Sequence, residues 1–177
     1  MTYSYRDDPM LGSVLAYWVR KRGTRPMPCR RDIDPTEISR ELLPNLQIVE
    51  VVDGGARFRY RLAGTALVEA YGEEFTGKYS DELFCGERLR FMHEMYRAVC
   101  ASKAPLFARN KYKTPRNIEF AAYRIYMPLS DDGGDVHHIF GVLRLELGVH
   151  LDSGIWGDGV NLDSGEQYVE PIAAIVG

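Results

Sequence analysis

The order in which strand-like and helix-like segments follow one another is the strongest constraint on the fold of this chain. Two segments with the two-residue alternation of a β-strand, 46–52 and 57–62, come first; three more, 106–113, 118–129 and 136–147, come last. Short turns rich in Gly and Asp, or containing Pro, join neighbouring segments within each group, as antiparallel hairpins require. Helical segments fill the middle. The sequence therefore predicts an α+β domain with a five-stranded antiparallel sheet and helices on one face.

Capping residues and apolar spacing predict three helices besides the one at the N-terminus: 34–44, 65–71 and 86–102. Residues 72–83 have the composition of a loop. In the longest helix, one set of residues repeats at helical spacing and is expected to be buried: Leu89, Met92, Tyr96 and Val99. A second set is charged and is expected to face water: Arg88, Arg90, Glu94 and Arg97.

An amphipathic helix is predicted at the N-terminus. Asp8 can cap it, Pro9 suits its first turn, and Gly23 can end it after a basic last turn. Its apolar face has the spacing of a single helical stripe and consists of Leu11, Val14, Leu15 and Trp18.

The last two predicted strands carry apolar side chains on both faces. Tyr123, Ile125 and Met127 alternate with Phe120 and Ala122, and the final strand shows the same two-sided pattern. A sheet with one face in water would alternate more strictly. The second face therefore needs a cover, which the N-terminal helix can provide for its own sheet or for that of a partner. On this reasoning Leu11, Val14, Leu15 and Trp18 are candidate partner contacts, and a homodimer is expected.

Composition and charge narrow the class of protein. The chain has 177 residues and a net charge of −3, so neither nucleic acid nor an anionic membrane surface is an expected partner. The sequence contains no long apolar run and no secretion signal at its N-terminus. Its three cysteines lack a C-x-x-C pair. These features predict a cytoplasmic protein with reduced thiols.

Several motifs in this order resemble a bacterial, alphaproteobacterial-type PAS-domain subfamily of short stand-alone proteins. They are Leu15-Ala16-Tyr17-Trp18, Arg31-Asp32-Ile33-Asp34-Pro35, Phe58-Arg59-Tyr60-Arg61-Leu62-Ala63-Gly64-Thr65, Phe75-Thr76-Gly77-Lys78 and Tyr126-Met127-Pro128-Leu129-Ser130-Asp131-Asp132-Gly133. The resemblance spans residues 9–147 and implies a sensory or regulatory module that works with a signalling protein partner. It divides the chain into an N-terminal helix and linker (1–31), a PAS-like core (32–147) and a tail (148–177), with a short docked segment expected at 172–176.

The resemblance also implies a small-molecule pocket between the sheet and its helices. Candidate ligand-binding residues are Tyr60, Met92, Tyr96, Tyr123 and His138. The competing interpretation is that these side chains simply fill the core. The sequence leaves any ligand or cofactor unknown. His93 lies off the apolar stripe that would face a haem, neither Cys85 nor Cys100 has a photosensory flavin context, and no metal site is expected.

Alternatives remain open at this level. No catalytic motif is present, so no catalytic residue and no enzyme activity are predicted. A small pocket enzyme of the ketosteroid-isomerase type would need a buried carboxylate, for which only Glu119 and Glu146 are candidates. The third possibility is a ligand-free protein-interaction module with a filled core. Arg57, Arg59 and Arg61 line one strand face, where pairing with local acids is favoured over binding of an anion.

Overall fold

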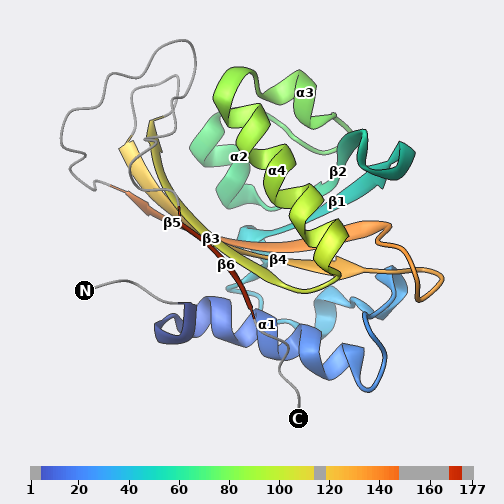
Figure 1. Ribbon diagram of the computed structural model, residues 1–177. Coiled ribbons are helices and arrows are strands. Elements are labelled where there is room, and N and C mark those ends of the chain that lie inside the picture. Colours follow the sequence, from blue (N-terminus) through green and yellow to red (C-terminus); the bar gives the residue numbers. More distant parts are fainter. Residues whose placement is uncertain (1–4, 114–118, 148–167, 173–177) are drawn as a thin grey trace.

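The computed structural model describes residues 5–113, 119–147 and 168–172, and its centre is a single antiparallel sheet (Figure 1). The strand order is β2-β1-β5-β4-β3-β6, so the first and last hairpins meet where β1 pairs with β5. The strands are β1 (Leu46–Val52), β2 (Arg57–Ala63), β3 (Leu106–Lys113), β4 (Glu119–Leu129), β5 (His138–Leu147) and β6 (Tyr168–Pro171). The predicted α+β architecture is confirmed, together with all five predicted strands.

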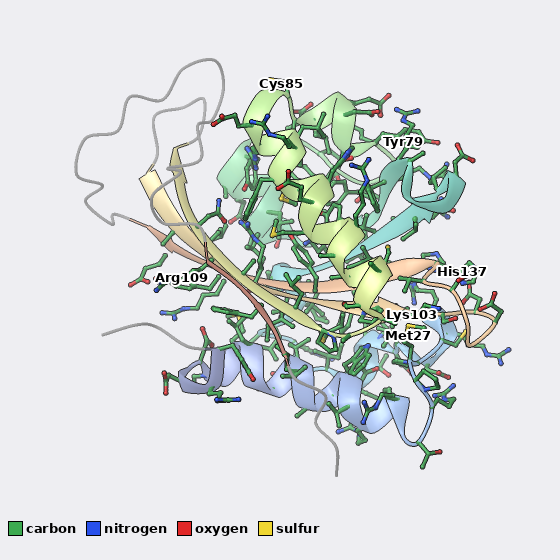
Figure 2. All side chains as sticks on the ribbon, viewed as in Figure 1. Met27, Tyr79, Cys85, Lys103, Arg109 and His137 are labelled. Atoms are coloured by element: carbon green, nitrogen blue, oxygen red, sulfur yellow. The ribbon has the colours of Figure 1, made fainter. Side chains whose placement is uncertain are left out.

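Helices cover the sheet on both sides. The helices α2 (Thr65–Tyr71), α3 (Ser80–Leu83) and α4 (Gly86–Ser102) lie on one face, and α1 (Pro9–Arg22) lies across the other (Figure 1). Side chains fill both layers (Figure 2). The two-sided apolar pattern of β4 and β5 is explained by these two covers.

Helix α1 forms where its sequence signals place it. The Asp8 carboxylate accepts hydrogen bonds from the backbone N–H groups of Met10 and Leu11, and Gly23 ends the helix at φ +58°. The indole Nε1–H of Trp18 donates a 2.9 Å hydrogen bond to the carbonyl of Pro128 at the end of β4. Helix α1 therefore covers the sheet of its own chain.

The segment 34–44, predicted as one helix, instead contains two 3-10 turns, Pro35–Glu37 and Leu43–Asn45. Asp34 caps the first turn as expected, but Ile38 directly after it is extended, which ends the helical run. Proline has no backbone N–H group and is therefore best tolerated in the first turn of a helix. Pro44 lies in such a position, in the turn Leu43–Asn45. The predicted loop 72–83 likewise contains the short helix α3, which begins after Tyr79.

Strict alternation along β2 would place Leu62 on the buried face with Phe58 and Tyr60, but the structure exposes it. The pairing of β1 with β2 shifts at Ile48, where Arg61 is left without a partner on β1. Such a bulge turns the following side chain to the other side. Leu62 is 38% exposed as a result.

The tail also contributes to the sheet. Strand β6 pairs antiparallel with β3 and makes the sheet six-stranded rather than five-stranded. Ile172, the first residue of the expected docked segment, is buried; the remainder of that segment, 173–176, lies outside the described residues.

Candidate functional site

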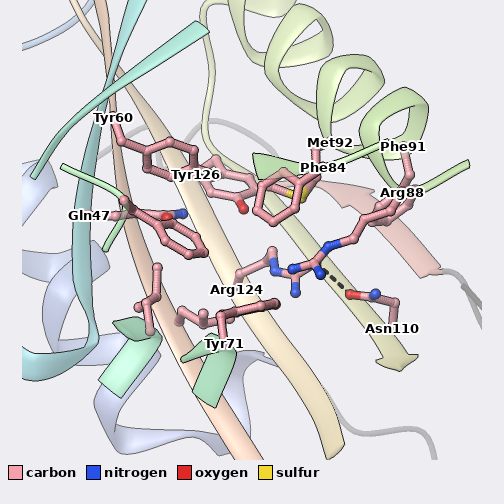
Figure 3. Close-up of a pocket in the computed structure, with 13 residues that line it drawn as sticks. Gln47, Tyr60, Tyr71, Phe84, Arg88, Phe91, Met92, Asn110, Arg124 and Tyr126 are labelled. Carbon is pink, nitrogen blue, oxygen red and sulfur yellow. Dashed lines mark hydrogen bonds between the residues drawn. The ribbon is translucent and has the colours of Figure 1, made fainter. Parts of the chain in front are cut away.

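A pocket lies between the sheet and the α2–α4 layer (Figure 3). Its volume is about 20 Å³, which is room for a single water molecule. Strands and helices both contribute to its lining, which consists of Gln47, Tyr60, Leu67, Tyr71, Phe75, Phe84, Arg88, Phe91, Met92, Asn110, Arg124, Tyr126 and Leu143. None of these described lining residues is an Asp or Glu.

Strand alternation places the polar side chains of the pocket floor. Arg124 and Tyr126 are two residues apart on β4 and therefore point to the same face. Asn110 on neighbouring β3 and Gln47 on β1 reach the same space. Gly141 on β5 leaves room for Gln47, because a Cβ atom there would lie 2.7 Å from the Gln47 side chain.

Two arginines enter this pocket and point toward one another, Arg88 from α4 and Arg124 from β4 (Figure 3). They are only 7% and 3% exposed, respectively. Arg124 donates a hydrogen bond to the side-chain oxygen of Asn110. The Arg88 guanidinium carbon lies 4.2 Å from the ring centre of Tyr71 and 4.0 Å from that of Phe84. Stacking on aromatic faces is a favourable setting for a desolvated guanidinium.

The expectation that Arg88 faces water is therefore wrong. Met92, Tyr96 and Val99 form the buried stripe of α4, and Arg88 lies one turn before Met92 on that same stripe. The periodicity contained this signal. A charged residue on an apolar stripe is a candidate for a buried functional group, whereas the charge alone suggested a surface position.

A cluster of three tyrosines borders the pocket: Tyr60 and Tyr126 line it, and Tyr96 is buried beside them. The hydroxyl groups of Tyr60 and Tyr96 are 2.9 Å apart and share a hydrogen bond, and the Tyr96 and Tyr126 rings meet edge to face. Burial raises the pKa of both Tyr60 and Tyr96 above the ordinary value of 10.0. These hydroxyls therefore stay protonated and act as neutral donors and acceptors at physiological pH.

Comparison with known families gives one match: a family model described as a PAS domain covers residues 6–144. The chain belongs to the PAS domain family. The match begins ahead of α1 and ends within β5, so α1 lies inside the family's boundaries and β6 lies outside them. No curated protein sequence matches the chain.

Two of the five sequence-predicted ligand residues, Tyr60 and Met92, line the pocket of this PAS domain. Tyr96 is buried next to it and contacts it through Tyr60. Tyr123 and His138 do not wall this pocket, because they lie on the face of the sheet covered by α1. Tyr123 packs near Arg144, which forms an ion pair with Asp8 at the start of α1.

His138 stands at the beginning of β5, on the same face as Phe140, whose ring meets that of Tyr17 on α1. Its Nδ1 atom is buried and lies 3.8 Å from the Asp131 carboxylate, beyond hydrogen-bonding distance. Burial is the largest influence on His138 and lowers its pKa from 6.5. The sequence pattern placed Tyr123 and His138 on strands of the sheet. It could not show which helices cover the face on which each side chain lies.

The four residues proposed as partner contacts are buried within the chain itself. Leu11, Val14, Leu15 and Trp18 are all 4% exposed or less, under the α1 face of the sheet. A dimer formed through these side chains would require α1 to leave its own sheet.

The remaining candidates lie away from the pocket. His93 shares a 2.8 Å hydrogen bond with Ser80 and packs against Phe58. Arg57 forms an ion pair with Asp81, and Arg59 forms one with Glu50. These two arginines therefore pair with nearby acidic residues, which is the interpretation that the sequence favoured. Glu146, the described candidate for a buried catalytic carboxylate, is exposed; the side chain of Glu119 lies outside the described residues.

Two further properties of the described residues bear on the role of the chain. No helix in the described ranges is long and apolar enough to cross a lipid bilayer. Across the residues that the structure describes, His, Cys, Asp and Glu do not gather into a group of three that could hold a metal ion.

Proposed function

We propose that this PAS domain is a regulatory module that binds a small molecule in the pocket between the sheet and α2–α4. The observation that supports this most is the convergence of buried charged and polar side chains on one space in the core. A ligand site is typically a concave, mostly apolar space with a few placed polar groups. The lining fits that description, with Arg88, Arg124, Asn110 and Gln47 among aromatic and aliphatic side chains. PAS domains as a family are sensory and regulatory modules.

Strand β4 offers a physical route by which occupancy of the pocket could reach a signalling protein. Arg124 and Tyr126 face the pocket, and the carbonyl of Pro128, two residues further on, accepts the hydrogen bond from Trp18 of α1. A ligand that shifts β4 by a fraction of an ångström would change the contacts that hold α1. We therefore propose α1 as the element that a signalling partner, or a second copy of the chain, responds to.

Native mass spectrometry of the freshly purified full-length protein, with an absorption spectrum, tests ligand binding directly. A bound metabolite would appear as a mass above that of the chain, and haem or flavin would appear in the spectrum. A screen of small molecules by thermal unfolding follows, because a ligand that binds only the folded state raises the unfolding temperature. The proposal fails if no compound of any class binds.

A second candidate function is a ligand-free protein-interaction module, and the small volume of the pocket favours it. At about 20 Å³, the space in this conformation admits no more than a very small molecule unless side chains move. Such a module would show no bound mass and no response to small molecules, yet would still bind its partner protein.

A further inference from the structure

A second pocket lies beside α1 and shares no lining residue with the core pocket. Its volume is about 250 Å³, far larger than the roughly 20 Å³ of the core pocket. Three segments that are distant in the sequence form it: the C-terminal half of α1 with the linker after it, the connection from α4 to β3 at 102–105, and Ile172 directly after β6. A molecule in this space would therefore contact α1 and the body of the domain at once.

The deepest part of this pocket is apolar. Leu15, Trp18 and Ile172 are buried, and the partly buried side chains of Val19 and Ala104 add to the wall. The one polar atom of the Trp18 side chain, its indole nitrogen, already donates its hydrogen to the carbonyl of Pro128. These five side chains therefore offer a ligand apolar surface and no further hydrogen-bond donor.

The outer part of the pocket is cationic, and both of its cations have partners. The Lys103 ammonium lies 3.8 Å from the Asp135 carboxylate, and the Arg22 guanidinium carbon lies 5.7 Å from the centre of the Trp18 ring. An anionic ligand would bring its charge close to that of Asp135, whereas an uncharged ligand needs no counter-charge. An aromatic ring is attracted to a neighbouring cation through its π face, and a saturated ring of the same size is not.

We propose that the pocket beside α1 binds an uncharged aromatic molecule of one or two fused rings. The size supports this class, because an apolar cavity of about 150 Å³ is enough to hold benzene. A volume of about 250 Å³ adds room for a second fused ring. Such a ligand binds only while α1 lies on its sheet, so it stabilises the docked position of the helix.

The first test measures binding of four probes to the full-length protein by saturation-transfer NMR and thermal unfolding at pH 7. Indole and phenol are the uncharged aromatic probes, cyclohexanol is the saturated counterpart of phenol, and benzoate is the anionic counterpart. We expect saturable binding of indole and phenol, several-fold weaker binding of cyclohexanol, and at least tenfold weaker binding of benzoate. The proposal is overturned if indole and phenol do not bind, or if cyclohexanol or benzoate binds as tightly as phenol.

Substitutions that fill the pocket locate the bound probe. Ala104→Leu places a larger side chain in the wall and should weaken indole binding at least tenfold. Ala101→Leu is the matched control, because Ala101 is exposed on the last turn of α4 and does not line the pocket, and it should leave binding unchanged. If Ala104→Leu unfolds, Val19→Met fills the same space from α1, with Ala16→Met on the exposed side of that helix as its control. Unchanged affinity in the filling variants would place indole elsewhere and contradict the proposal.

Two other occupants of the pocket would show themselves in the same experiments. Light scattering that finds a dimer for the original chain and a monomer for Ala104→Leu would assign the pocket to a second copy. Binding of indole only after Ile175→Asp would assign it to the residues that follow Ile172. Either result overturns the proposal. The proposed function is tested separately, since a compound that binds the Ala104→Leu variant as tightly as the original chain would point to the core pocket.

Discussion

The two faces of the sheet are covered in different ways. Under α1 the buried side chains Leu11, Val14 and Trp18 are apolar and the helix packs on β4 and β5, with polar contacts that include the indole hydrogen bond of Trp18 and the ion pair of Asp8 with Arg144. Under α2–α4 the core contains two arginines, two side-chain amides and a cluster of tyrosines.

This difference distinguishes the α1 face, where the helix serves as a structural cover, from the α2–α4 face, which contains the candidate site. Apolar packing stabilises roughly in proportion to the buried area and is non-directional. Buried polar groups contribute little net stability and are costly when a partner is lost, yet they fix the positions of side chains. A domain that needed only stability could fill both faces like the α1 face. The polar character of the α2–α4 face is therefore the best reason to look for function there.

The largest expected effect tests the apolar face. Replacing Trp18 with Ala removes a side chain that is only 1% exposed, and should lower the free energy of unfolding. Large-to-small changes of this kind cost about 3–5 kcal/mol. Urea denaturation followed by circular dichroism measures the loss. The control is Arg20→Ala on the exposed side of the same helix, where a surface ion pair with Glu37 is worth less than about 1 kcal/mol. A loss below about 1 kcal/mol for Trp18→Ala would show that α1 is only loosely docked.

The sequence predicted the elements whose signals are local. Asp8 and Gly23 at the ends of α1, and the 17-residue apolar pattern of α4, gave the boundaries that the structure has. Long-range features were not accessible in this way. Strand β6 exists because of its pairing with β3, and the bulge that exposes Leu62 depends on the register with β1.

The candidate site was predicted only in part, and for a physical reason. Tyr60 and Met92 were found because aromatic and Met side chains are natural pocket walls. Arg88 and Arg124 were missed because charge is usually a sign of exposure. Tyr123 and His138 were grouped with Tyr60 and Met92 because alternation shows which residues share a face of one strand. Alternation does not show which helices cover that face.

Asp8 makes a buried polar contact on the α1 face, and its replacement ranks second in expected effect. Its carboxylate caps α1 and also lies 3.1 Å from Arg144 on β5. Loss of a cap costs about 0.5–2 kcal/mol, and loss of a buried ionic partner adds to that. Asp8→Ala should therefore cost about 2 kcal/mol or more, whereas Asp8→Asn keeps the cap and should cost about half as much. A double-mutant cycle with Arg144→Met isolates the ion pair. Equal losses for Ala and Asn would mean that the charge, rather than the cap, is what matters.

On the α2–α4 face, Tyr96→Phe should have a smaller effect. The change removes the hydroxyl that pairs with Tyr60 and leaves the rings in place. A buried polar group that loses its partner costs about 1–3 kcal/mol. Tyr79→Phe is the control, because Tyr79 is half-buried and contacts Arg57 through its ring; it should change stability by less than about 0.5 kcal/mol. A neutral result for Tyr96→Phe would weaken the contrast between the two faces.

The smallest expected effect is a pH dependence with one histidine on each face. Burial is the largest influence on both His138 and His93 and lowers the pKa of each from the ordinary 6.5. Above that value both residues are neutral, folded or unfolded, and contribute no slope. Below it the unfolded chain takes up protons that the folded chain resists, so stability falls as the pH drops from about 6.5 through the folded pKa. Urea midpoints measured between pH 7 and pH 5 should show this loss.

Single substitutions assign the loss to a face. His138 is surrounded by Asp131 and Glu50, which favour its protonation, and by Arg30 and His137, which oppose it. His93 has Asp81 on one side and Arg97 on the other. His138→Gln and His93→Gln should each flatten part of the slope, and the double variant should remove most of it above pH 5, where carboxylates begin to titrate. Because His93 shares a hydrogen bond with Ser80 and His138 Nδ1 has no partner within hydrogen-bonding distance, His93→Gln should also lower stability at pH 7 more than His138→Gln does. The reverse order would mean that the β5 end of the α1 face, rather than α4, depends on its histidine for packing.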